Sequence, residues 1–536
     1  MKLSVKILCA LLAIMMLLAV MASCGDTPAE TTPKETTEKN PETTKAPGTS
    51  SVPDASDPDA TLPDESTPDE SESEESTTPD TEDETTSITD LKDLLPPDMD
   101  LGRDMTIFVG TLYYDEWLDS DDGDIVGSEI YNRVLRVEKN LGIDLTVDRM
   151  PGDSNYIDTI IAEVEKRQES TDPNMIADLC STYSMYAGKL TISGRYQNIA
   201  NSDMIDLENP WWPKDLLENS TIDDKVYFVS GDISPTLIYE TYAIFYNLKL
   251  TEQYNIEDPI NLVNNYKWTL DKVISMTSGI YEDLDTSVKG PSQGDFFAFN
   301  FNDNAHIKAF PFAMGVRVVV PDDEEGYVFS EIYSGTKTDT IVSKMVNWID
   351  NNNGVKTAND FNDYGNCFKT SKCIFTVGNF AFAAQHLAGS GLDYAVVPCP
   401  LYDEDQTEYY SYYGNPTSFW GVPTNADIDD SCALLESLAA DAYVYVSPAL
   451  FERALKIKYV TGEVDGLSKM FDIIRDGLVF DACMFYKLCG IGSHYSDFNE
   501  IANSISSWSS KFDNFEMKRM KKTMTALAKS LRDLEY

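Results

Sequence analysis

The side chains best suited to binding a ligand are aromatic and acidic residues that stand at predicted loop ends, outside the apolar periods. The chain contains 29 Tyr and 7 Trp. A flat aromatic ring packs well on the C–H face of a pyranose, and Asp, Glu and Asn exchange hydrogen bonds with its hydroxyl groups. This combination favours a carbohydrate ligand. The aromatic candidates are Tyr113, Trp117, Tyr183, Trp211, Trp212, Tyr413 and Trp420, and the acidic candidates are Asp115, Asp232 and Glu240.

A packing role is the alternative for each of these residues, because large aromatic side chains usually lie in a core or between lobes. Trp117 is the preferred ligand contact, since it stands beside Asp115 in a loop that follows a predicted strand. The Trp211-Trp212 pair is expected to brace the N-terminal lobe. Asp232 and Glu240 either hydrogen-bond a sugar hydroxyl or cap local turns.

The spacing of the polar residues gives no motif for catalysis, metal binding or phosphate binding. The acidic run at residues 119–124 does not match the twelve-residue EF-hand loop, and no Lys-Ser or Lys-Thr follows the glycines between residues 378 and 391 in the required register. The histidines, His306, His386 and His494, are scattered, and no nucleophile elbow is present. We therefore predict no catalytic residues, no metal and no cofactor.

Acidic residues dominate the composition. The 90 Asp and Glu against 41 Lys and Arg give a formal net charge of −49. Since binding to phosphates needs clustered cations, neither a nucleic acid nor an anionic membrane surface is an expected partner. Such acidity mainly indicates solubility.

The cysteines give no sign of a zinc site. Beyond Cys9 and Cys24 their number is odd, and they form no CxxC pair and no His-flanked cluster. Most lie in apolar runs and are predicted to be buried thiols that pack as small apolar groups. Free thiols in an exported protein indicate a reducing habitat.

The start of the chain resembles a bacterial lipoprotein signal. Lys2 and Lys6 precede an apolar stretch at residues 7–20, and Met21-Ala22-Ser23-Cys24 places small residues before a cysteine. The resemblance implies a signal peptide at residues 1–23 and a lipid on Cys24, which anchors the protein at the extracellular face of the cell membrane. The alternatives are an ordinary secretory signal or a short membrane anchor, although a spanning helix needs about 20 apolar residues. Every alternative exports the chain.

Residues 24–98 follow as an acidic spacer rich in Thr, Pro, Ser, Asp and Glu. Such a segment buries too little apolar surface to offset its ordering entropy, so we expect an extended tether, either bare or O-glycosylated. The rest of the chain, from about residue 101 to residue 536, is too long for one ordinary core and fits one two-lobed unit or two domains.

Strand-like and helix-like segments alternate at the start of the folded part. Strands are predicted at residues 105–110, 143–148 and 175–180, and helices at residues 129–141 and 156–168. This β-α-β-α-β order implies parallel strands joined by right-handed crossovers, and hence an α/β sheet covered by helices on both faces. Ligands bind beyond the carboxyl ends of such strands. The candidates that stand there are Tyr113, Asp115, Trp117 and Tyr183.

Several segments occur in a characteristic order between residue 105 and about residue 486. They are Ile176-Ala177-Asp178-Leu179, residues 224–229, residues 242–250, Trp268-Thr269-Leu270, residues 367–380, residues 394–401 and Gly421-Val422-Pro423. In this order and spacing the chain resembles extracellular solute-binding proteins of family 1, the receptors of sugar-type ABC importers. It departs from the family at residues 230–232, in a long insert at residues 281–306, and in a tail at residues 490–536 that does not align.

The resemblance implies an α/β, two-lobed periplasmic-binding-protein-like fold of type II, with an interlobe cleft and a hinge. It assigns residues 101–247 to the first part of lobe 1, 248–410 to lobe 2, 411–460 to the return to lobe 1, and the helical residues 461–536 mainly to lobe 2. Asn379 and Phe380 match the family's ligand loop in the second lobe and join the candidates.

The function that the resemblance implies is that of a monomeric, non-enzymatic receptor. Anchored through Cys24, it would capture a small solute, preferably a carbohydrate or oligosaccharide, by hinge closure and present it to the transmembrane subunits of an ABC permease. Two rivals stay open. One is a surface-anchored glycan hydrolase that uses two carboxylates, which 90 acidic residues always permit. The other is a surface adhesin or structural lipoprotein that has lost transport.

Overall fold

Two large β-sheets organise the part of the chain that the computed structural model describes. The described residues are 92–112, 116–292, 294–302, 306–358, 361–451, 466–491, 494–512 and 514–534. The predicted signal peptide, Cys24, the tether up to residue 91, and the candidates Tyr113 and Asp115 lie outside them. Within the described ranges, no helix combines the length and the apolar character that crossing a membrane requires.

The first sheet has the strand order β12-β3-β1-β2 and defines lobe 1. Its strands are β1 (Met105–Thr111), β2 (Leu145–Pro151), β3 (Leu179–Tyr183) and β12 (Ser418–Gly421). β1 runs parallel to β2 and β3, as predicted, whereas β12 returns from much later in the sequence and lies antiparallel to β3. β3 begins later than predicted because a 3-10 turn, η2 (Pro173–Met175), occupies the start of the expected strand.

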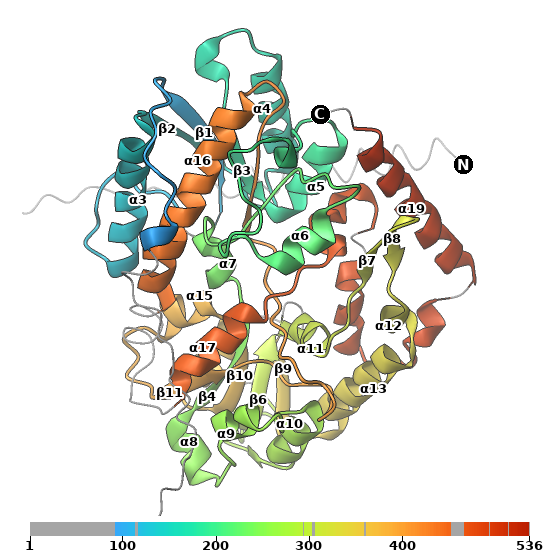
Figure 1. The fold of residues 1–536 in the computed structure, drawn as a ribbon. Helices are drawn as coiled ribbons and strands as arrows, with labels where there is room; N and C mark the ends of the chain where they lie inside the picture. Colours follow the sequence, from blue (N-terminus) through green and yellow to red (C-terminus); the bar gives the residue numbers. More distant parts are fainter. Residues whose placement is uncertain are drawn as a thin grey trace, which may run out of the picture. The chain divides into compact units, whose positions relative to one another are not determined.

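Helices pack around this sheet, and α3 and α16 lie side by side along it (Figure 1). α3 shows how the sequence sets its helices: the Asp124 carboxylate accepts a hydrogen bond from the Val126 amide at 3.1 Å, and Gly142 ends the helix at φ 62°. The elements of lobe 1 outside the sheet are η1 (Lys92–Leu94), α3 (Ile125–Leu141), α4 (Ile157–Glu169), α5 (Ser184–Ile192), η3 (Ile199–Asn201), α6 (Lys214–Ser220), α7 (Pro235–Tyr239), α16 (Ile428–Asp441) and the π-helix η6 (Ala442–Val446).

The second sheet has the order β11-β4-β10-β6-β5, with β9 paired to β6, and defines lobe 2. Its strands are β4 (Tyr242–Asn247), β5 (Tyr281–Glu282), β6 (Phe296–Asn302), β9 (Val355–Ala358), β10 (Cys373–Asn379) and β11 (Tyr394–Val397). β4 pairs with both β10 and β11, so residues 242–247, which the sequence placed at the end of lobe 1, belong to this sheet. All six residues of β4 are buried, as expected for a strand covered on both faces.

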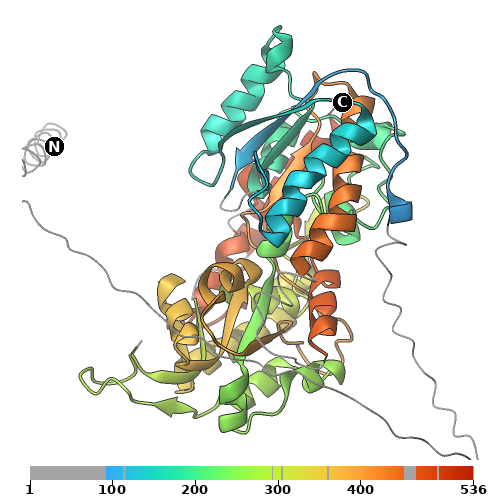
Figure 2. The same cartoon turned by 90° about the vertical axis from the view of Figure 1, so that its left-hand side faces the viewer.

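Figure 2 shows the two sheets as separate parts of the fold. The elements around the second sheet are α8 (Leu248–Gln253), α9 (Pro259–Asn264), α10 (Leu270–Thr277), η4 (His306–Lys308), α11 (Ala309–Ala313), α12 (Glu331–Ser334), α13 (Thr336–Asn351), α14 (Phe361–Lys369), α15 (Phe380–Phe382), the π-helix η5 (Ala383–Leu387) and α17 (Leu467–Asp476). The Thr269 hydroxyl caps α10 by accepting a hydrogen bond from the Lys272 amide at 3.2 Å.

The C-terminal segment contacts both lobes, whereas the sequence placed it mainly on lobe 2. α17 packs on β11 of lobe 2, but α18 and η8 pack on α5 of lobe 1, and α19 lies along β8 and also touches α5 (Figure 1). The C-terminal elements after α17 are α18 (Ala482–Phe485), η8 (Lys487–Cys489), η9 (His494–Ile501), η10 (Ser509–Lys511) and α19 (Asn514–Arg532). The hairpin that they pack against comes from earlier in the chain and consists of β7 (Val319–Asp322) and β8 (Gly326–Phe329). The apolar face of α19 is buried through Met520, Met524, Leu527 and Leu531.

The cysteines beyond Cys24 are unpaired, and six of the seven are buried, as predicted. They are Cys180, Cys367, Cys373, Cys399, Cys432 and Cys483, with Cys489 half-buried. Burial raises the pKa of the Cys180, Cys399 and Cys432 thiols to about 12.

A buried polar network fixes the interior of lobe 1. The guanidinium of Arg133 donates hydrogen bonds to the carbonyl oxygens of Ile233 and Glu116, both at 2.9 Å. The carboxylate of Glu116 accepts hydrogen bonds from Thr236 and from the Ser418 hydroxyl. Burial raises the pKa of Glu116, although these hydrogen bonds and the charge of Arg133 act in the opposite direction. The network ties α3, α7 and β12 together.

Replacing Arg133 by Met should destabilise the protein by roughly 3 kcal/mol, because two buried carbonyl groups lose their donor and the Glu116 carboxylate loses a nearby cation. Denaturant unfolding measures this change. Arg149→Met is the matched control, since Arg149 pairs with the exposed Asp119 and should change stability by less than about 1 kcal/mol. Equal effects of the two substitutions would contradict the role given to the buried network.

Candidate ligand-binding cleft

Three of the described segments that run between the lobes hydrogen-bond to one another. The Gly414 amide donates to the Glu240 carbonyl at 2.8 Å, and the Tyr242 amide donates to the Tyr412 carbonyl at 2.9 Å. Ser411 makes two hydrogen bonds to the third segment. Its amide donates to the Gly477 carbonyl at 2.7 Å, and its carbonyl accepts from the Val479 amide at 3.1 Å. These bonds make a narrow three-stranded connection at residues 240–242, 411–414 and 477–479, which we call the hinge.

Two adjoining cavities open beside the hinge. The first has a volume of about 430 Å³ and the second about 720 Å³. Their shared lining residues are Asp215, Glu408, Asp476 and Leu478. Because Asp215 comes from α6 of lobe 1 and Asp476 from α17 of lobe 2, the cavities form one cleft between the lobes.

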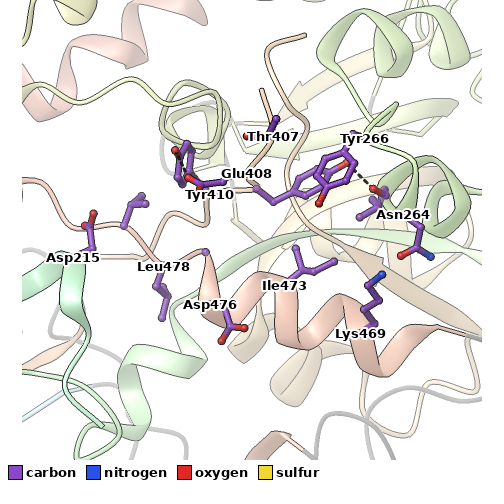
Figure 3. Close-up of a pocket in the computed structure, with 14 residues that line it drawn as sticks. Asp215, Asn264, Tyr266, Thr407, Glu408, Tyr410, Lys469, Ile473, Asp476 and Leu478 are labelled. Atoms are coloured by element: carbon purple, nitrogen blue, oxygen red, sulfur yellow. Dashed lines mark hydrogen bonds between the residues drawn. The ribbon is translucent and has the colours of Figure 1, made fainter. Parts of the chain in front are cut away.

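Tyrosines from lobe 2 line the first cavity (Figure 3). Tyr266 is 49% exposed and stacks on Tyr409 with ring centroids 6.1 Å apart and planes 18° apart. The Tyr409 hydroxyl donates to the Val263 carbonyl at 3.2 Å, which holds this ring in place. Tyr266 has a φ of 55°, which a residue with a Cβ rarely adopts, and the position follows the end of α9 directly. The exposed ring of Tyr266 is therefore supported by the Tyr409 ring, which its hydrogen bond to Val263 holds in place.

Tyr410 forms another part of the same wall. Its hydroxyl donates to the Glu408 carboxylate at 2.8 Å, and the guanidinium of Arg317 lies 4.9 Å from its ring centroid. Burial lowers the pKa of Arg317, while the carboxylates of Asp215 and Asp481 raise it.

Side chains of both lobes also meet in the second cavity. Arg475 of α17 forms an ion pair with Asp232 of lobe 1 at 3.0 Å, and its guanidinium lies 5.4 Å from the ring centroid of Tyr443. Trp212 lines this cavity and donates from its indole nitrogen to Glu436 at 3.1 Å. The arrangement offers flat rings, carboxylates and a guanidinium to one ligand.

Of the predicted site residues, Asp232 lies in the cleft, where it lines the second cavity. Glu240, Asn379 and Tyr413 meet instead at the hinge. The Asn379 side chain donates to the Glu240 carboxylate at 3.1 Å, and Thr241 bridges to Tyr413. Phe380 is buried beneath α17, with its ring centroid 5.6 Å from that of Phe471.

The remaining described candidates are packed inside lobe 1. Trp117 is 4% exposed, lies under the Arg133 guanidinium at 4.6 Å and neighbours Trp420, and neither indole lines the cleft. Tyr183 is buried against Tyr186. Ligand contact at these positions stays a prediction, which the packing does not favour. Of the Trp211-Trp212 pair, both are buried in lobe 1 as expected, and Trp212 also faces the cleft.

The sequence-based reasoning missed most of the cleft. Tyr266, Asp215 and the adjacent pair Arg475-Asp476 come from three segments far apart in the chain, and no local spacing joins these segments. The one usable signal was the tyrosine run at residues 409–413, from which only Tyr413 was selected.

Comparison with solved structures identifies the fold. The maltose-binding periplasmic protein MalE from Listeria monocytogenes, in complex with maltose, is similar over 81% of this chain and 99% of that chain, with a TM-score of 0.50 and 13% identity. This chain has the periplasmic solute-binding-protein fold. An ABC substrate-binding protein from Listeria monocytogenes in complex with cycloalternan aligns over 80% of this chain and 98% of that chain, with a TM-score of 0.48 and 10% identity. No family model and no curated protein matches the sequence.

The solute-binding-protein fold confirms the predicted two-lobed α/β class, with open sheets in both lobes. Within the described ranges, no group of three or more His, Cys, Asp or Glu side chains is arranged to hold a metal ion.

Gly414→Ala tests the packing of the hinge. A Cβ at position 414 would overlap the Glu240 carboxylate, so this substitution should cost about 1–3 kcal/mol of stability. In a Glu240→Ala background the same change should cost less than about 0.5 kcal/mol, because the obstructing oxygen is gone. A double-mutant cycle by denaturant unfolding measures the difference. If the losses in free energy of unfolding are additive, a Cβ at position 414 does not clash with the Glu240 carboxylate.

Proposed function

We propose that this protein is an extracellular receptor that captures a carbohydrate in the cleft between its lobes, and that it is anchored to the cell membrane through a lipid on Cys24. The observation that carries the proposal is the stacked pair of Tyr266 and Tyr409, whose outer ring is exposed in a cleft that both lobes line. An exposed aromatic platform beside carboxylates is the usual surface for a sugar ring.

The lining residues supply the other contacts that a sugar needs. Asp215, Asp232 and Asp476 accept hydrogen bonds from hydroxyl groups, and Arg475 and Lys469 donate them. A dissociation constant near one micromolar corresponds to about −8 kcal/mol, which one or two stacked rings and a few hydrogen bonds provide. The maltose-binding protein that shares the fold carries maltose, which supports a sugar as the class of solute.

Capture works by closure about the hinge. Because the hinge is a few hydrogen-bonded backbone strands, a ligand that contacts both lobes shifts the population toward the closed form. The closed form would then be recognised by the transmembrane subunits of an ABC permease, which receive the solute. No covalent step is required, and the solute should be recovered unchanged.

A thermal-melting panel tests the proposed function. With the chain from Cys24 onward, carrying Cys24→Ser, a sugar that binds only the folded state raises stability by RT ln(1 + [L]/Kd), about 2.7 kcal/mol at a hundredfold excess over Kd. Tyr266→Ala should remove most of this gain, since it deletes the exposed ring of the stack.

Tyr156→Ala is the matched control, because Tyr156 is 38% exposed and stands at the start of α4, away from the cleft. It should leave the sugar-induced shift unchanged. A panel of mono- and oligosaccharides that produces no shift at millimolar concentration would overturn the carbohydrate assignment, and equal losses in both variants would remove Tyr266 from the site.

A further inference from the structure

We propose that the solute carries a positive charge, as in a sugar or short oligosaccharide with a free amino group, and that its ammonium group pairs with Asp215. This inference rests on the proposed function and names the class of carbohydrate. The two cavities and their aromatic rings define the site. The numbers of carboxylates and cations that line the two cavities then decide whether the site prefers a charged or a neutral solute.

Asp215 occupies the junction of the two cavities, and its second carboxylate oxygen is available to a ligand. Oδ2 accepts a hydrogen bond from the Phe480 amide at 2.5 Å, while Oδ1 has no hydrogen-bond partner among the described residues. In Figure 3 Asp215 stands at one end of the cavity and the Tyr266 ring at the other. The same cavity therefore connects the exposed ring with this carboxylate.

Most cations of the cleft are already engaged. The lining carboxylates are Glu208, Asp215, Glu218, Asp232, Glu408 and Asp476, and the lining cations are Lys214, Lys469 and Arg475. Arg475 pairs with Asp232 and Lys214 with Glu218. Lys469 is thus the single lining cation that faces the four remaining carboxylates without an ion pair to one of the described residues.

Asp215 forms no ion pair with a described residue and shares the charge of the Arg317 guanidinium with Asp481. Burial raises the pKa of Asp215, although the Phe480 amide and the Arg317 guanidinium act in the opposite direction. The Arg317 guanidinium donates instead to the carbonyls of Phe312 and Val316, at 3.2 and 3.0 Å, and lies over Tyr410. Asp476, at the rim, also has a pKa raised by desolvation. A cation brought by the ligand would stabilise both charged carboxylates.

An organic ammonium group fits this arrangement better than a metal ion. The carboxylates of the junction stand on α6, α17 and the segment at residue 408, and within the described ranges no three such groups converge as metal ligands do. An ammonium group needs only one close carboxylate, gains from further acidic groups near it, and is attracted by the faces of tyrosine rings. The skeleton that carries it supplies the surface for stacking.

Titration calorimetry with matched oligosaccharides of two to four units tests the inference. The probes are glucosamine oligomers, their N-acetylated forms and glucose oligomers, which differ in charge far more than in shape. We expect the amine-bearing series to bind at least tenfold more tightly than both neutral series at low salt, and to lose most of that advantage at 0.5 M salt.

Asp215→Asn is the decisive variant, because Asn keeps an oxygen that can accept from the Phe480 amide and removes only the charge. It should lower the affinity for the amine series at least tenfold more than the affinity for the neutral series. The control is the double variant Asp158→Asn/Asp323→Asn, two aspartates outside the cleft, which should leave both series unchanged. Melting temperatures verify that each variant is folded.

The outcomes separate this inference from the proposed function. Neutral oligosaccharides that bind as tightly as their amine counterparts, or an Asp215→Asn variant that keeps its preference for amines, would overturn the charged solute and leave the sugar receptor standing. Binding of none of the three series would instead count against both.

Discussion

The structure depends on a small set of backbone hydrogen bonds where three segments cross between the lobes. Each lobe has its own sheet, and one hydrophobic cluster continues through both lobes. The pairing of residues 240–242, 411–414 and 477–479 joins the lobes beside the cleft that Tyr266, Asp215 and Arg475 line. Such a connection resists sliding, because slipping would break bonds, yet bending needs only small changes of a few dihedral angles. The hinge therefore fixes which residues line the cleft, whereas bending at the hinge would change the width of the cleft.

The polar groups in the core of lobe 1 and the polar groups of the cleft have different roles. In lobe 1 the groups around Glu116 and Arg133 are paired inside the core, which locks α7 and the segment that enters the hinge. In the cleft, Asp215 and Asp476 reach a surface that solvent or a ligand can contact. Buried polar groups that hydrogen-bond to one another favour one conformation, whereas polar groups with unused oxygens can accept hydrogen bonds from a ligand.

Sequence patterns predicted the fold far better than the site, for a physical reason. Strand and helix periods arise from neighbours along the chain, so the strand at residues 105–110 and the helix that ends at Leu141 were found almost as they stand. A cleft arises from residues that only the folded chain brings together. Trp117 was selected because it follows a strand, but its ring is enclosed by Arg133 and Trp420, whereas Tyr266 follows an inconspicuous polar segment.

The unpaired cysteines bear on the chemical stability of the chain. A thiol with a pKa near 12 is deprotonated in only about one molecule in 100,000 at pH 7, and the thiolate is the species that attacks oxidants and disulfides. Packing thus lowers the reactivity of the Cys180, Cys399 and Cys432 thiols without any cross-link. Oxidation of these three sulfur atoms then becomes a measure of how often the lobes unfold, so its rate would depend on global opening, a kinetic property, more than on the chemistry of the sulfur atoms.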